Sequence, residues 1–62
     1  MLFKYFTTPT NTSVAINPFN VECVRETNID GHRITHIQLS SGASQQVVDD
    51  YLEVVARLSE PV

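Results

Sequence analysis

Two histidines, His32 and His36, are the first residues of this 62-residue chain whose spacing suggests chemistry. On a helix, two histidines four residues apart lie on one face and resemble the second half of a zinc-finger motif. The run 33–39 that contains His36 is strand-like, however, and four residues of strand span roughly 13 Å. That distance is too long for two ligands of one metal ion. We therefore expect no metal site and no bound cofactor.

The other reactive residue types also lack a catalytic arrangement. Serine, histidine and aspartate are present, but without the glycine pattern of a nucleophile elbow. The segment 40–44 contains Gly42 yet lacks the lysine and the spacing of a phosphate-binding loop, so it predicts a hairpin turn. Asp49, Asp50 and Glu53 suit the start of a helix better than a cation site. We expect no catalytic residues and a protein that is not an enzyme.

Cys23 is the single cysteine of the chain, which excludes an intrachain disulfide and a cysteine-based zinc cage. A lone thiol fits a reducing compartment, and its simplest interpretation is a small buried apolar residue. The chain starts without the pattern of a secretion signal, and no run approaches the roughly 20 apolar residues that cross a bilayer. We expect a cytoplasmic protein with no membrane partner.

The charge balance bears on nucleic-acid binding. Seven acidic residues stand against four basic ones, a net charge of −3, whereas nucleic-acid affinity requires a basic face. Arg25 and Arg33 are the one candidate exception. We expect them diagonally across a hairpin on the same face, near its tip, where they would form an anion or RNA patch with the N-terminal aromatic residues close by. The alternative is a solvated hairpin end in which either arginine pairs with an acidic neighbour.

The elements that would position these residues centre on a β-hairpin. The runs 21–27 and 33–39 are strand-like, and Asn28-Ile29-Asp30-Gly31-His32 lies between them. A three-residue loop with Gly31 at a bulge pairs Asn28 with His32 and sets Val21 opposite Leu39. It also sets Cys23 opposite Ile37, which gives a core face of Val21, Cys23, Ile37 and Leu39. A two-residue Asp30-Gly31 turn would set Glu22 opposite Leu39 and Cys23 opposite Gln38. We favour the first register because turn chemistry and burial agree in it.

In the favoured register the opposite face of the hairpin is mixed, with an apolar island ringed by polar groups. The island is formed by Val24 and Ile34, and His36 lies beside it. The simpler explanation for these apolar residues is that another part of the chain covers them. The more specific explanation is that a partner subunit does. We therefore take Val24, Ile34 and His36 as a candidate partner surface.

The remaining segments complete a small α+β domain. Strands are expected at 2–7, 13–16 and 44–48, with turns at 8–12, 17–20 and 40–43. Apolar residues then recur at helical spacing, which predicts a C-terminal helix at about 49–59 that stops before Pro61. The same periodicity leaves open a start near Ser44. We expect one domain, 1–62, with four to five short antiparallel strands, an arrangement that would also permit a small barrel.

The pattern from Val14-Ala15-Ile16-Asn17-Pro18 through Val21 and Val24 to Ile37-Gln38-Leu39-Ser40-Ser41-Gly42 resembles a known group of small proteins. It is similar to the FlbD-type proteins of bacterial flagellar operons and to short phage-encoded proteins of the same layout. The resemblance covers roughly residues 13–59, and the segments 8–12 and 44–46 depart from it. It implies a bacterial or phage accessory protein without catalytic residues.

Two functions follow as hypotheses. The first is a non-enzymatic interaction or assembly protein that acts as a homo-oligomer or with a protein partner. It is suggested by the small size of the chain, the mixed hairpin face and the aromatic N-terminal segment. The second is a small-barrel RNA-binding protein that uses Arg25 and Arg33. No small-molecule substrate is expected for either.

Overall fold

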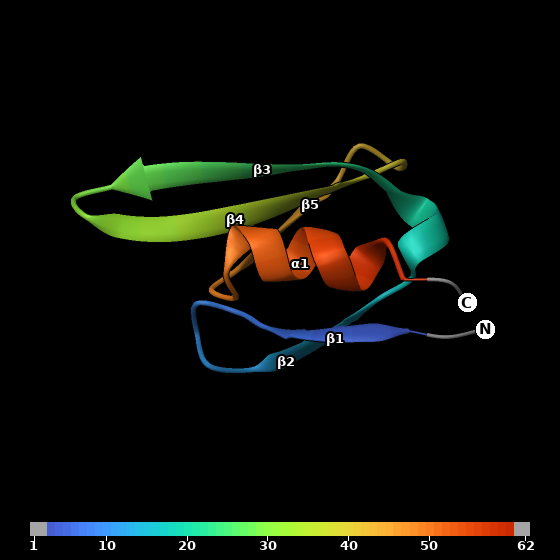
Figure 1. Ribbon diagram of the computed structural model, residues 1–62, viewed down its shortest axis with the longest axis horizontal. Helices are drawn as coiled ribbons and strands as arrows, with labels where there is room; N and C mark the ends of the chain where they lie inside the picture. The colour runs from blue at the N-terminus through green and yellow to red at the C-terminus, as the bar shows by residue number, and fades with distance from the viewer. Residues whose placement is uncertain (1–2, 61–62) are drawn as a thin grey trace.

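The computed structural model describes residues 3–60, which form two antiparallel sheets and one C-terminal helix (Figure 1). Strands β1 (Lys4–Thr7) and β2 (Ser13–Ile16) form a two-stranded sheet. A short 3-10 helix, η1 (Pro18–Asn20), leads into the second sheet, whose order is β3 (Val21–Ile29), β4 (His32–Leu39) and β5 (Ser44–Val47). Helix α1 spans Tyr51–Leu58. The α+β class is confirmed, and the described strands form two sheets rather than a closed barrel.

The first hairpin follows its expected boundaries closely. Strand β2 lies where the sequence predicts it, whereas β1 begins at Lys4, and the predicted strand residue Leu2 lies outside the described residues. The turn between them is closed by Thr8 N–H, which donates to Thr12 O at 2.8 Å, and by their hydroxyl groups, 2.6 Å apart. Asn11 takes the left-handed conformation there, with φ of 64°, a geometry that asparagine tolerates. The 8–12 segment thus serves as the hairpin loop.

The register of the β3–β4 hairpin differs from the one favoured by the sequence. Ile29 pairs with His32, so the loop is the two-residue Asp30-Gly31 turn. Both turn residues have positive φ, 53° and 80°, as a type I′ turn requires. Its backbone twist matches that of the flanking strands, and this preference decides the loop length. The predicted pairing of Asn28 with His32 is therefore wrong.

A β-bulge at Glu22 reconciles this turn with burial. From the turn back to Cys23 the pairing is regular, with Cys23 opposite Gln38 and not opposite Ile37. The register then shifts by one residue, so that Val21 pairs with Leu39 as predicted and the extra residue Glu22 is exposed. Without the bulge Glu22 would face the core opposite Leu39. The bulge is the feature that the sequence reasoning missed.

Helix α1 begins late, as the sequence predicts. Asp50 is the N-cap, and its carboxylate accepts a hydrogen bond from Leu52 N at 3.1 Å. Glu53 lies in the first turn and Arg57 in the last, each at the end of the helix dipole that suits its charge. The start near Ser44 is excluded because 44–47 is strand β5. The predicted stop residue, Pro61, lies outside the described residues.

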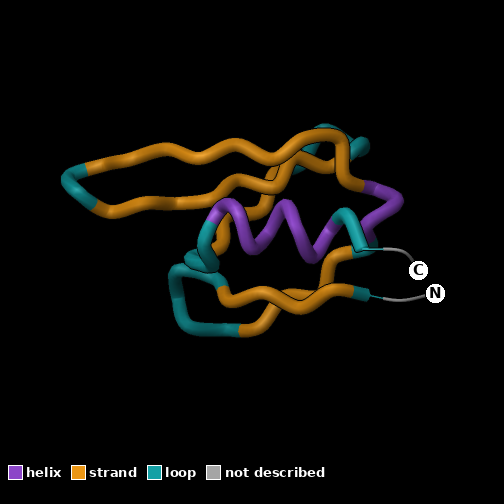
Figure 2. The backbone as a smooth tube through the Cα atoms, viewed as in Figure 1, coloured by secondary structure: helices purple, strands orange, loops and turns teal. Residues whose placement is uncertain are grey.

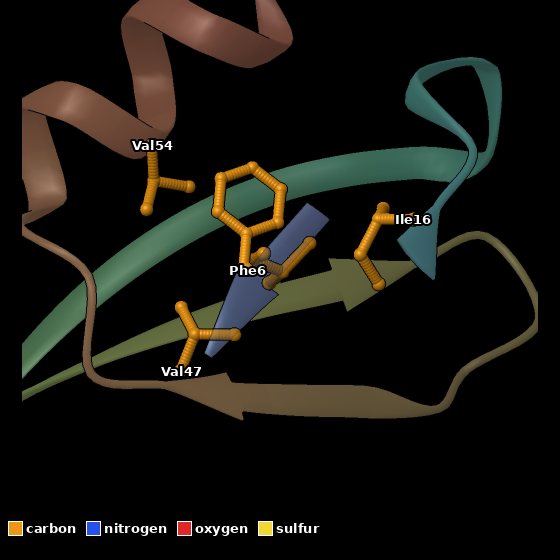
Figure 3. Packing of buried hydrophobic residues seen from close by; sticks show 5 residues of the cluster. Phe6, Ile16, Val47 and Val54 are labelled. Carbon is orange, nitrogen blue, oxygen red and sulfur yellow. The ribbon is translucent and has the colours of Figure 1, made fainter. Parts of the chain in front are cut away.

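The core lies where the helix meets strands of both sheets (Figure 3). One side chain from each of five elements is almost fully buried: Phe6, Ile16, Ile37, Val47 and Val54. Half-buried apolar residues surround them, namely Val14, Val21, Val24, Leu39 and Leu58. The predicted core residues Val21, Ile37 and Leu39 therefore do face the core. Cys23 does not, because its pairing with Gln38 turns it to the outer face.

Asp49 joins the two sheets and the helix. Its Oδ1 accepts a hydrogen bond from Thr7 N in β1 at 2.7 Å, and its backbone oxygen accepts one from Thr35 Oγ1 in β4 at 2.9 Å. Next to it, Val48 N donates to Thr7 O at 2.9 Å. Thr35 is the one buried polar residue of the described chain, and this bond satisfies its hydroxyl.

Arg57 extends the same junction across the helix. Its guanidinium lies 4.0 Å from Asp49 Oδ2 and 4.5 Å from the centre of the Phe6 ring. A cation over an aromatic face is attracted by the ring quadrupole. Arg57 thus covers the edge of the core while Asp49 orients it.

We expect Ile37→Ala to lower the free energy of unfolding by about 2–5 kcal/mol, since it removes a fully buried side chain from the centre of the core. Leu52→Ala is the control, because Leu52 is 73% exposed on α1. Urea denaturation followed by circular dichroism gives both values. Equal losses for the two variants would contradict this placement of the core.

The neighbouring residues Asp49 and Asp50 are expected to respond differently to substitution. Asp49→Ala removes a charged acceptor from Thr7 N and should cost about 1.5–3 kcal/mol of unfolding free energy. Asp50→Asn should cost almost nothing, since asparagine caps a helix about as well as aspartate. Thermal and urea denaturation measure both, and a neutral Asp49→Ala would show that the junction does not hold the sheets together.

Candidate interaction surface

The outer half of the β3–β4 hairpin extends beyond the rest of the protein along its longest axis (Figures 1 and 2). Residues 25–33 are all exposed, and we call this segment the hairpin tip. The overall extents of 36 × 21 × 19 Å reflect this extension. Neither α1 nor the β1–β2 sheet covers the tip in this view, so its side chains are available to another molecule.

The outer face of the hairpin combines apolar and hydrogen-bonding groups. Thr27 Oγ1 and His36 Nε2 lie 2.8 Å apart, and Cys23 Sγ lies 3.6 Å from Gln38 Oε1. Ile29, beside the turn, is 60% exposed. Because cross-strand partners share a face, the full set is Cys23, Arg25, Thr27, Ile29, His32, Ile34, His36 and Gln38.

The structure separates the three residues of the candidate partner surface. Ile34 and His36 lie on the outer face, half-buried, and they remain neighbours along β4. Val24 pairs with Ile37 and packs against the core. The one-residue difference in loop length moves the β3 side chains from Cys23 to the turn to the other face, so Val24 faces the core while Cys23 and Arg25 face outward; Val21, before the bulge, keeps its predicted place.

The same difference separates the two arginines. Arg25 pairs with His36 on the outer face, whereas Arg33 pairs with Asn28 on the opposite face. The prediction that they share a face is wrong. The described ion pairs involve Lys4 and Arg57 and neither of these two arginines.

The free edge of β3 is the feature that the sequence reasoning did not weigh. In the sheet order β3-β4-β5, β3 has a neighbour on one side only, and its nine residues make it the longest strand. The other edge strands, β1, β2 and β5, have four residues each. The segment 21–29 contains no proline or lysine, two residues that guard many sheet edges, although it carries the bulge at Glu22 and three charged side chains. The lack of proline and lysine in this segment is visible in the sequence and could have indicated an accessible edge.

The other large exposed apolar side chains lie on separate elements. Phe3 lies just before β1 and Tyr5 on it, Phe19 is in η1, Val48 follows β5 and Leu52 is on α1. Residues 3–60 show no pocket and no group of three metal-ligating side chains. Within the same range, no helix has the length and apolar character to cross a membrane.

A scan against protein-family models found no match to this chain, and neither did searches of curated proteins and of solved structures.

The exposed position of Cys23 leads to a direct measurement. In the folded protein its thiol should react with a thiol reagent at nearly the rate found in urea, because the outer face leaves it accessible. The control places a cysteine in the core, as Val47→Cys combined with Cys23→Ser, and should react at least roughly tenfold more slowly when folded. Protection of Cys23 equal to that of the control would restore the register predicted from the sequence.

Proposed function

We propose that this chain is a non-enzymatic assembly protein of the cytoplasm that associates with further copies of itself through the β3–β4 hairpin. The single observation that carries this proposal is the exposed tip, residues 25–33. Ordering each residue costs roughly 1–2 kcal/mol of backbone entropy, and burial offsets little of that cost at the tip. Contact with a second surface would supply the missing burial.

The tip carries one large apolar side chain that a second copy could cover. Ile29 is 60% exposed at its end, and the chain is small enough to bury only about 60% of its unfolded surface on its own. Domains of this size commonly gain stability from a partner subunit. The resemblance to FlbD-type accessory proteins points in the same direction.

The positions of the two arginines do not support RNA binding as a second function. That hypothesis depends on Arg25 and Arg33 sharing a face, and they lie on opposite faces of the hairpin. The net charge of −3 also argues against nucleic-acid binding.

Sedimentation equilibrium tests the proposal. The full chain at micromolar concentrations should show a mass above 7.0 kDa that rises with concentration. Ile29→Ser should weaken association about tenfold or more, since burying an isoleucine is worth roughly 1.5–3 kcal/mol. Leu52→Ser is the matched control, because Leu52 is a similar apolar side chain that is at least as exposed, on the helix.

Two outcomes would overturn the proposal. One is a 7.0 kDa monomer at every concentration. The other is association that Leu52→Ser abolishes while Ile29→Ser leaves it intact, which would place the contact on α1.

A further inference from the structure

We infer that two copies of this chain pair along the free edges of their β3 strands, antiparallel, with Thr27 of each copy facing the other across a two-fold axis. This inference rests on the proposed self-association and specifies its geometry. The three-stranded sheets of the two copies would join into one continuous sheet.

The backbone of β3 offers the hydrogen bonds for such a pairing. In a two-residue hairpin the pair beside the turn, here Ile29 and His32, exchanges both hydrogen bonds, and bonded pairs then alternate along the strands. Odd-numbered residues from Ile29 back to Cys23 therefore bond to β4. Val24, Glu26 and Asn28 direct their N–H and C=O groups away from β4, towards the free edge.

Charge selects the register. A two-fold axis normal to the sheet places a residue opposite itself in the second copy. An axis at Arg25 opposes two arginines, and one at Glu26 opposes two glutamates, both destabilising. An axis at residue 24 or 28 leaves only 23–25 or 27–29 paired within the regular stretch. An axis at Thr27 pairs all of 25–29 with no like charges opposed.

The contacts in this register are complementary. Thr27 meets Thr27 of the second copy, a favourable cross-strand pair. Glu26 meets Asn28, whose N–H and C=O groups also point to the free edge. Arg25 meets Ile29, so its methylene stem can cover the side chain that is 60% exposed in one copy.

The shape of the protein also favours an axis near the tip. The hairpin extends beyond α1 and the β1–β2 sheet, so an axis at Thr27 leaves the two helices at opposite ends of the joined sheet (Figure 1). An axis further back, beyond the bulge at Glu22, would bring η1 of each copy towards the other and would lose the regular strand. The tip is the stretch that is both regular and clear of the other elements.

Cysteine cross-linking tests the register. In a Cys23→Ser background, Thr27→Cys should form a covalent dimer in a glutathione redox buffer. Cα atoms of a non-hydrogen-bonded pair lie about 4.5 Å apart, within the range that a disulfide spans. Arg25→Cys in the same background is the control, since the two copies of that residue would be about 13 Å apart. We expect a roughly tenfold or larger difference in initial rate on non-reducing gels.

A second pair of variants tests the use of the edge itself. Asn28→Pro removes an N–H group that points to the free edge and leaves the bonds of Asn28's own hairpin intact, so the variant should fold and sediment as a monomer. Asn28→Ala keeps the N–H group and should associate like the wild type. Circular dichroism of both variants checks that the fold is retained.

The outcomes separate this inference from the proposed function. If the wild type associates but Arg25→Cys cross-links faster than Thr27→Cys, or Asn28→Pro associates as well as Asn28→Ala, the geometry is overturned and self-association stands. If the wild type is a monomer and neither cysteine variant cross-links, both are overturned.

Discussion

The hydrogen bond from Thr7 N to the carboxylate of Asp49 is the interaction on which the rest of the architecture depends. The β1–β2 hairpin has only four-residue strands, and an isolated hairpin of that kind is marginal in water. At Thr7 the backbone bonds both to Asp49 and to Val48, so β1 is fixed to the segment that leaves β5. That attachment places Phe6 beside Val47 and Val54 (Figure 3), in the core cluster that also holds Ile37. The junction therefore joins the β1–β2 hairpin to the core.

The burial of the β3–β4 hairpin is uneven as a consequence. The two small elements that cover the second sheet, the β1–β2 hairpin and α1, are each too short to cover strands of nine and eight residues. They lie over the end of the hairpin near the bulge, where Val21, Val24 and Leu39 meet the core. The tip remains exposed because the chain has no further element to place over it among the described residues. Length mismatch, rather than a special sequence, thus creates the candidate surface.

The sequence predicts the elements well and the hairpin geometry poorly. Alternation and helical periodicity identify the strands and the late helix, since both patterns reflect which side of an element is buried. The choice of register failed at Glu22. Burial requires Val21 opposite Leu39, the turn requires Ile29 opposite His32, and only an inserted residue satisfies both. A bulge leaves no local signature here, because Glu22 is an ordinary exposed strand residue. The role of Asp49 was equally hidden, since a carboxylate before a helix also suits its dipole.

Association through a single strand edge stops at the dimer. Self-association of this kind therefore does not lead to aggregation. An isologous pairing uses the same edge in both copies. In the dimer both β3 edges are therefore paired, and neither can bind a third chain. The other sheet edges belong to β1, β2 and β5, whose four-residue length offers few hydrogen bonds to another chain. The hydrogen bond from Val48 N to Thr7 O also connects the end of β5 to β1, which leaves less of these two strand edges free. A long edge next to short ones therefore favours a closed pair over an extended sheet. Charge acts in the same sense: Arg25 or Glu26 opposes itself in the registers centred on either residue, and of the registers without that repulsion the Thr27-centred one pairs the longest regular stretch.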